Sequence, residues 1–180
     1  ASKEEQRFRF EKNKKKVAQV AQTIKFANAD IIALSEIGGK QSLINFNREY
    51  LDSKYKVFLI EGNSNRGIDV GYLVKTDSSL TYSHHTNKDR LINFNYKHER
   101  EDNEICIREG FPISHPVHKF SRDISELRVF KKGSKVPCLI VLLVHLKSRL
   151  DDYMDRQGKS RRRAELITLV DVYKEIDEHF

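Results

Sequence analysis

The sequence predicts an α/β protein (α+β in some schemes) built on mixed sheets. Short apolar runs typical of buried strands alternate with stretches in which apolar residues recur at helical spacing. A strand–helix–strand succession over residues 31–61 predicts a parallel crossover, and the strand–turn–strand succession over residues 55–75 predicts an antiparallel hairpin. A sheet that contains both connections is mixed.

The first half of the chain is expected to hold two helices and three strands. Ser2 and Glu5 have the spacing of a capping box, and an apolar stripe that ends at Ile24 predicts a helix after it. The elements expected next are a strand at 31–36, a helix at 41–51, a strand at 55–61, a turn rich in Gly and Asn at 62–67, and a strand at 68–75.

The second half begins with a polar stretch, residues 83–120, which predicts a long excursion rather than a linker. A second hairpin follows, with strands at 124–130 and 138–145, and the six apolar residues 139–144 call for burial on both faces. Residues 160–180 close the chain as a helix. Its inward face is expected to comprise Leu166, Leu169, Tyr173, Ile176 and Phe180.

Composition limits the class of protein. With 180 residues, of which 38% are hydrophobic, the chain can form one domain with a core. No apolar run approaches ~18 residues, so we expect a soluble chain without a membrane span. The net charge of +7 favours a polyanionic partner such as nucleic acid.

The basic segment 147–163 concentrates this charge. Its three arginines at 161–163 stand at a helix start, where the macrodipole disfavours cations. A nucleic-acid backbone and a solvated basic loop both fit this segment.

Polar residues gather where the strands of the first half end. Glu36 is the last residue of the strand at 31–36, and sites in open α/β sheets form at the carboxyl ends of parallel strands. The turn that contains Asn65 and Arg66 is expected at the same edge. Asp69 shares that edge because the strand after the turn runs back.

The second hairpin brings a base and two cations together. Folding the hairpin about residues 134 and 135 sets Ile124 opposite His145, and Arg122 roughly opposite Lys147. The segment "SRD" therefore lies beside "HLKS". The apolar strand at 138–145 ends on a histidine that faces positive charge.

Phosphoester cleavage uses these residue types together. Mg²⁺ binds carboxylate oxygens and usually keeps several waters, and it polarises a phosphoryl oxygen. A histidine transfers a proton or donates a hydrogen bond, and an arginine binds a phosphate through two parallel hydrogen bonds. The alternative is that Glu36 and His145 are ordinary strand ends that reach water.

Four motifs carry a resemblance to a known family. In order along residues 29–149, "ADIIALSEI", "NRGIDVGYLV", "FSRDISELRV" and "VLLVHLKSR" resemble the endonuclease/exonuclease/phosphatase superfamily. The resemblance implies a four-layer α/β/β/α sandwich of two mixed sheets. It also implies phosphoester hydrolysis that depends on Mg²⁺, with Mn²⁺ as a second option.

The resemblance assigns roles to single residues. Glu36 matches the metal-ligating glutamate, and His145 matches the histidine at the scissile phosphate in the deoxyribonuclease and sphingomyelinase branches. Asp69 is the second expected catalytic residue, and it can instead orient Arg66 or a neighbour. The residues expected to bind substrate phosphate are Arg122, Arg66, Asn65 and Lys147. Ser35 departs from the family's usual Gln, which affects hydrogen bonding around the metal more than the choice of metal.

The chain also departs from the family pattern by absence. The sequence contains no Gly-Asp and no Asp-His dipeptide, so the later motifs Gly-Asp-x-Asn and Ser-Asp-His are missing, and so is the first strand. We therefore expect residues 1–180 to form a single, partial domain that is inactive alone and self-associates through open sheet edges.

The expected function is a Mg²⁺-dependent phosphoester hydrolase, in the first place a nuclease that cleaves DNA or RNA. Two alternatives stay open. One is a non-catalytic nucleic-acid-binding member of the fold, and the other is a lipid or inositol phosphate phosphoesterase.

Overall fold

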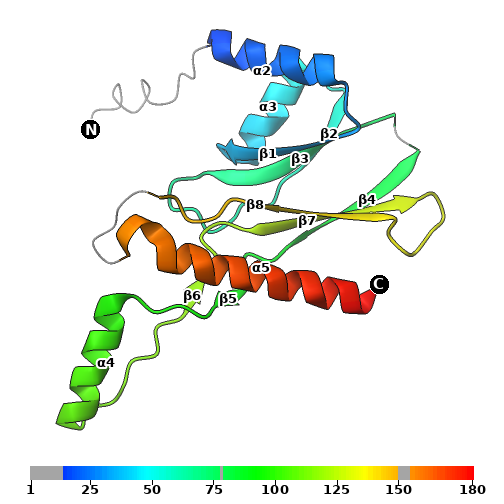
Figure 1. The fold of residues 1–180 in the computed structure, drawn as a ribbon. Helices are drawn as coiled ribbons and strands as arrows, with labels where there is room; N and C mark the ends of the chain where they lie inside the picture. Colours follow the sequence, from blue (N-terminus) through cyan, green and yellow to red (C-terminus); the bar gives the residue numbers. More distant parts are fainter. Residues whose placement is uncertain (1–13, 78, 150–154) are drawn as a thin grey trace.

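The computed structural model describes residues 14–77, 79–149 and 155–180 (Figure 1). Helices and strands both contribute, so the α/β class is confirmed. The capping box at Ser2 and Glu5 lies outside the described residues. The elements, in order, are α2 (Lys14–Ala27), β1 (Ile31–Ile37), α3 (Lys40–Tyr50), β2 (Tyr55–Phe58), β3 (Asp69–Lys75), β4 (Leu80–Thr86), β5 (Leu91–Ile92), α4 (Lys97–Glu109), β6 (His118–Lys119), β7 (Ile124–Lys131), β8 (Leu139–Val144), the 3-10 turn η1 (Arg156–Gly158) and α5 (Lys159–His179).

The elements form four layers. The first sheet has the order β1-β3-β2, and the second has the order β4-β7-β8. Helices α2 and α3 cover the outer face of the first sheet, and α5 runs along the outer face of the second (Figure 1). The two sheets face each other in the middle.

Three apolar clusters fill the spaces between these layers. Leu43 and Leu51 pack with Leu73 under α2 and α3. Tyr72 and Leu127 belong to the cluster between the sheets. The third cluster, with Val172 of α5, lies against the second sheet. Each strand therefore has its side chains distributed between two apolar layers.

The prediction of mixed sheets is wrong for the described strands, because all their pairings are antiparallel. β1 and β2 do run in the same direction, as the crossover predicts. β3 lies between them and pairs with both, so the two parallel strands are never hydrogen-bonded neighbours. A strand–helix–strand pattern fixes strand direction, but it does not show whether a later strand inserts between the two.

The second hairpin forms as predicted, with a register that differs by one residue. Ile124 pairs with Val144, not with His145. The turn bond from Ser134 N–H to Lys131 O and the bond from Cys138 N–H to Val129 O place the centre of the hairpin on Ser134 itself.

Helix α5 is rotated relative to the predicted inward face. Leu169 and Ile176 do pack inward, but Leu166, Tyr173 and Phe180 are about half exposed. The buried face instead carries Ala164, Glu165, Thr168 and Val172. The apolar pattern alone does not define this face, because α5 is apolar on more than one side.

The polar excursion contains structure that the sequence pattern does not predict. β4 occupies its first part and pairs with β7. Beyond β4, the short strands β5 and β6 pair at the root of a projection that carries α4, here called the arm (residues 91–119; Figure 1). No residue of α4 is buried, and Gly110 ends the helix in the left-handed conformation with φ 74°.

Among the described residues, no helix combines the length and the apolar character needed to cross a bilayer.

Candidate functional site

A cleft of about 740 Å³ lies where the two sheets, the arm and the start of α5 meet. The lining consists of residues 62–66, Tyr96, residues 117–122, Lys147, Ser148 and Arg161. All four residues predicted to bind substrate phosphate, Asn65, Arg66, Arg122 and Lys147, are in it. The structure therefore brings these four residues together in one cleft, and their binding of phosphate stays a prediction.

The lining of the cleft is cationic. Its charged side chains are Arg66, Lys119, Arg122, Lys147 and Arg161, and no Asp or Glu of the described residues is among the lining residues. Cations gathered in a concave surface focus their field and raise the local concentration of anions. The cleft therefore suits a ligand with more than one negative charge.

Arg122 is the most buried of these cations, with 7% of its surface exposed. Its Nη1 donates to the carbonyls of His145 (3.0 Å) and Leu146 (2.9 Å), whereas its Nε is buried and has no partner among the described residues. Burial lowers the pKa of Arg122, and nearby Arg66 lowers it further. An unpaired buried donor on a guanidinium is costly, and an anion that accepts from it removes that cost.

The loop at 62–67 packs directly on Arg122. A Cβ at Gly62 would lie 2.7 Å from the Arg122 carbonyl oxygen, so a side chain there is excluded. Asn63 N–H donates to the same carbonyl at 3.0 Å. This contact holds Asn65 and Arg66 at the mouth of the cleft.

Asp69 has a different place from that expected of a catalytic acid. It is 5% exposed, and its Oδ1 accepts the Gly62 N–H at 2.8 Å. The carboxylate thus fixes the loop that carries Arg66, which is the orienting role left open by the sequence. The register of β1 against β3 pairs Asp69 with Ile37, so Asp69 is close to Glu36 along the sheet, but its carboxylate is buried and bonded to the loop.

Glu36 and His145 come together from different sheets. Glu36 Oε1 lies 3.8 Å from His145 Nε2, although the two residues are far apart in the sequence. Neither residue lines the cleft, but the His145 carbonyl accepts from Arg122, so the pair adjoins it. The structure therefore places an exposed carboxylate and an imidazole beside a cationic cleft.

The backbone at Glu36 is unusual. Its φ of 59° is in the left-handed region, and the register of β1 against β3 shifts between Leu34 and Ile37. A non-glycine residue in this conformation costs on the order of 1–3 kcal/mol, and bulges of this kind re-aim side chains at functional sites. Here the bulge turns Glu36 out of the strand, with 71% of its side chain exposed.

His145 is held as a neutral imidazole. Burial lowers its pKa from the ordinary value, Arg122 and Arg66 lower it further, and Glu36 and Glu165 oppose the shift. Its Nδ1 is buried and has no partner among the described residues. At neutral pH the ring can accept a proton, which is the state that a general base requires.

A Mg²⁺ site needs more ligands than the described residues around Glu36 supply. Among the described residues, no group of three or more His, Cys, Asp and Glu side chains could hold a metal ion. Of the two carboxylates predicted at the site, Glu36 faces solvent and Asp69 is bonded to the backbone of the loop. The described residues thus supply one candidate ligand and do not complete a Mg²⁺ site by themselves.

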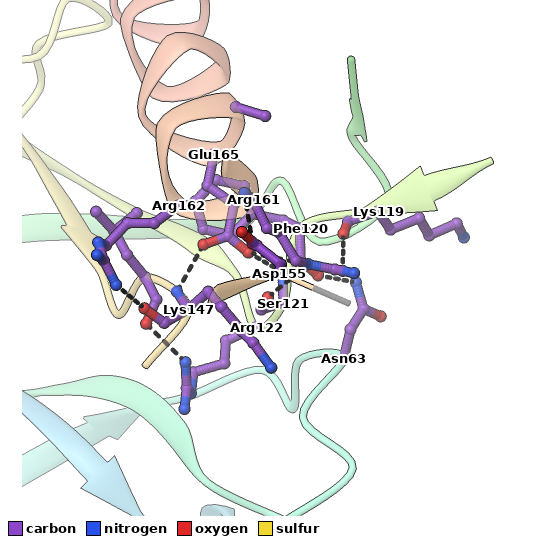
Figure 2. Close-up of polar contacts among 12 residues, drawn as sticks. Asn63, Lys119, Phe120, Ser121, Arg122, Lys147, Asp155, Arg161, Arg162 and Glu165 are labelled. Carbon is purple, nitrogen blue, oxygen red and sulfur yellow. Dashed lines mark hydrogen bonds and ion pairs between the residues drawn. The ribbon is translucent and has the colours of Figure 1, made fainter. Parts of the chain in front are cut away.

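Glu165 is a site residue that sequence reasoning missed. It is fully buried, with its Oε1 accepting from Ser121 N–H at 2.9 Å and its Oε2 accepting from Lys147 N–H at 2.6 Å (Figure 2). One carboxylate on α5 thereby joins the segments that carry Arg122 and His145. The available signal was an acid inside the apolar stretch "AELITLV".

The arginines at the start of α5 have internal partners. Arg161 donates to Ser121 Oγ, the Tyr96 hydroxyl and the Lys119 carbonyl, at 3.1, 2.9 and 2.9 Å. Arg162 donates to the carbonyls of Lys147 and Gln157. These contacts give Arg161 and Arg162 a structural role, and their contact with a nucleic-acid backbone stays a prediction. Residues 150–154 of the basic segment lie outside the described residues.

Asp155 binds free backbone N–H groups at the start of α5. Its carboxylate accepts the backbone N–H groups of Ser160 (3.0 Å) and Arg161 (2.9 Å; Figure 2). An acid at this end offsets the unfavourable placement of cations near the positive end of the helix dipole.

The comparisons with known proteins give no match: no family model, no curated protein and no solved structure matches this chain. The resemblance in the four motifs therefore remains a prediction.

Proposed function

We propose that this protein hydrolyses phosphodiester bonds in nucleic acid, with the backbone of the substrate bound in the cationic cleft. One observation carries the proposal. Glu36 and His145, which belong to different sheets, lie 3.8 Å apart beside a cleft lined by Arg66, Arg122 and Lys147. An acid, a neutral base and several phosphate-binding cations are the groups that phosphoester cleavage requires.

Each group has a defined part in this proposal. Arg122, Arg66 and Lys147 bind phosphate oxygens of the substrate backbone. His145 accepts or returns a proton at Nε2, and Glu36 orients that ring or binds a cation.

The proposed cofactor is Mg²⁺, or Mn²⁺ in its place, with Glu36 as one ligand alongside substrate oxygens and water. Such an ion would polarise the phosphoryl oxygen.

A second function is favoured by the isolated position of Glu36. Because the described residues offer one candidate metal ligand, the chain also fits a nucleic-acid-binding protein without catalysis. In that case the cleft would bind the backbone and no bond would be broken.

Hydrolysis assays on the full-length protein test the proposal. With Mg²⁺ and a labelled oligonucleotide, Glu36→Gln should abolish cleavage, and His145→Ala should lower the turnover number by roughly 10²- to 10⁴-fold. Glu49→Gln, at an exposed glutamate of α3, is the matched control and should cleave at the wild-type rate. Circular dichroism of each variant checks that the fold is retained.

Two results would overturn it. Wild-type rates in both site variants would remove the pair from the reaction. Binding of the oligonucleotide by a wild-type protein that never cleaves it would favour the binding function instead.

We also propose that residues 1–180 on their own associate with a second copy through the edge of the second sheet. Among the described strands, β8 has β7 as its one neighbour, and its six residues are all apolar. Open apolar edges pair with other chains.

A further inference from the structure

The arm forms part of the cleft wall. It contributes Tyr96, Val117, His118 and Lys119 to the lining, whereas the sandwich contributes Arg66, Arg122 and Lys147. The cleft is therefore built from two sources. The sandwich side of the cleft is mainly cationic, and the arm adds rings and an aliphatic side chain.

The root of the arm is fixed to the body of the protein. Arg161 of α5 donates to the Tyr96 hydroxyl and to the Lys119 carbonyl, and Arg90 forms a two-pronged ion pair with Glu175 of α5. Phe94 is buried in the cluster beneath α5. The arm residues in the cleft are thus held in place before any ligand binds, which reduces the entropy lost on binding.

The arm adds one exposed apolar side chain and two partly buried rings to the cleft, beside the charge of Lys119. Val117 is 66% exposed. The Tyr96 ring is half-buried: it stacks on His98 with centroids 5.7 Å apart, meets Phe94 (4.7 Å) and His118 (5.2 Å) edge to face, and has the Arg161 guanidinium carbon 6.0 Å from its centroid. Glu99 accepts from His118 at 3.0 Å, which orients that ring. Rings and an exposed valine beside phosphate-binding cations fit a ligand that carries a planar apolar group next to its phosphate.

We propose that the arm contacts an unpaired nucleobase and that the cleft therefore binds single-stranded nucleic acid in preference to a duplex. This inference rests on the proposed function. In a duplex, the faces of the bases are covered by their stacked neighbours, whereas in a single strand they are free to stack on aromatic side chains. The cleft volume of about 740 Å³ lies within the range of pockets that hold small ligands, which suits entry of individual nucleotides.

Three oligonucleotides of equal length separate base contacts from phosphate contacts. They are a single strand, the same strand with abasic sugars in place of nucleotides, and the duplex. Fluorescence anisotropy with the full-length protein, in chelator so that no cleavage occurs, should rank the single strand first. Its Kd should be about 5- to 150-fold lower than that of the abasic strand, the effect expected from one stacked base.

Paired variants assign this preference to the arm. Tyr96→Leu removes the ring and should reduce the ratio between the base-bearing and abasic strands towards one. Tyr96→Phe keeps the ring while losing the hydroxyl bonded to Arg161, and should keep the ratio. Val117→Ser should lower the ratio, whereas Val136→Ser, at a valine that is 59% exposed and outside the cleft lining, should not.

The outcomes separate a failure of the proposed base contact from a failure of the proposed function. Equal binding of the base-bearing and abasic strands, or tighter binding of the duplex, would overturn the base contact and leave phosphate binding intact. Failure of the wild-type protein to bind any of the three would remove the proposed function and this inference together. Equal ratios in Tyr96→Leu and the wild type would exclude the arm as the source of the preference.

Discussion

At the scale of single residues, Glu165 supports the site more than any residue that the motifs identified. Its two carboxylate oxygens accept from Ser121 and Lys147, so one side chain sets the positions of the segments that bear Arg122 and His145. A carboxylate is suited to this because both its oxygens are acceptors. An amide has one acceptor and one donor group, and the donor would face a backbone N–H.

We expect Glu165→Gln to lower the free energy of unfolding by about 1–3 kcal/mol, since one buried N–H loses its acceptor. Binding of a phosphate-bearing oligonucleotide should also weaken, because Arg122 and Lys147 lose their fixed spacing. Urea unfolding and fluorescence anisotropy measure the two effects. Glu178→Gln, at an exposed position of the same helix, is the control. A Glu165→Gln protein with wild-type stability and binding would show that the carboxylate does not organise the cleft.

Sequence reasoning located the cleft residues that belong to short motifs and missed the residues whose place depends on packing. Arg66, Arg122 and Lys147 stand at strand ends, and the alternation of apolar strands and polar ends is visible in the sequence. Glu165 and the structural role of Arg161 depend on which segments cross each other in space. No short stretch of the sequence shows which segments cross.

At the scale of elements, His84 shows how the two sheets are joined. It lies between them, with its ring edge-on to Phe58 (5.9 Å) and Tyr72 (5.8 Å), and its Nε2 is 2.7 Å from Ser125 Oγ. Burial lowers the pKa of His84 from 6.5 to about 4; His85 and Lys40 lower it further, and Glu126 opposes them. The packed sheets therefore accept the neutral ring and disfavour the charged one.

The stability of the protein should consequently fall as the pH is lowered from 6.5 towards 4. In that window His84 binds a proton in the unfolded chain and not in the folded one, so its protonation favours unfolding. His84→Gln keeps a polar partner for Ser125 without titrating, and its loss of stability over this window should be smaller. Thermal unfolding at a series of pH values measures the difference, with His115→Gln, at an exposed histidine of the arm, as control. Parallel pH curves for His84→Gln and the wild type would contradict this account.

The elements that the sequence predicted correctly are those with a core-facing pattern. β1, β3 and β8 are short apolar runs, β7 mixes apolar and polar residues, and all four form. α4 was missed because its sequence, KHEREDNEICIRE, has no apolar stripe. This helix has no buried residue, and its first turn is held locally by the bond from Tyr96 N–H to Glu99. Hydrophobic periodicity cannot reveal a helix that does not pack on a core.

At the scale of the whole molecule, the second sheet is unequally covered. β7 is largely buried between β4 and β8, whereas β8 is half-buried along most of its length although it is entirely apolar. The sequence predicts burial of residues 139–144 on both faces, but in the described part of the chain β8 is an edge strand. It has none of the charges, prolines or bulges that usually protect an edge from pairing.

The last prediction concerns this edge. Residues 1–180 alone should associate as their concentration rises, because pairing along β8 adds backbone hydrogen bonds and covers apolar side chains. Leu139→Lys places a charge on the strand at a position that is 50% exposed, and should shift the chain towards the monomer. Val136→Lys adds the same charge in the adjoining loop, outside the strand, and should leave association unchanged. Light scattering over a concentration series measures both. A wild-type chain that stays monomeric throughout would show that α5 and the β7–β8 hairpin shield the edge well enough by themselves. Equal effects of the two lysine substitutions on association would attribute it to net charge rather than to pairing along β8.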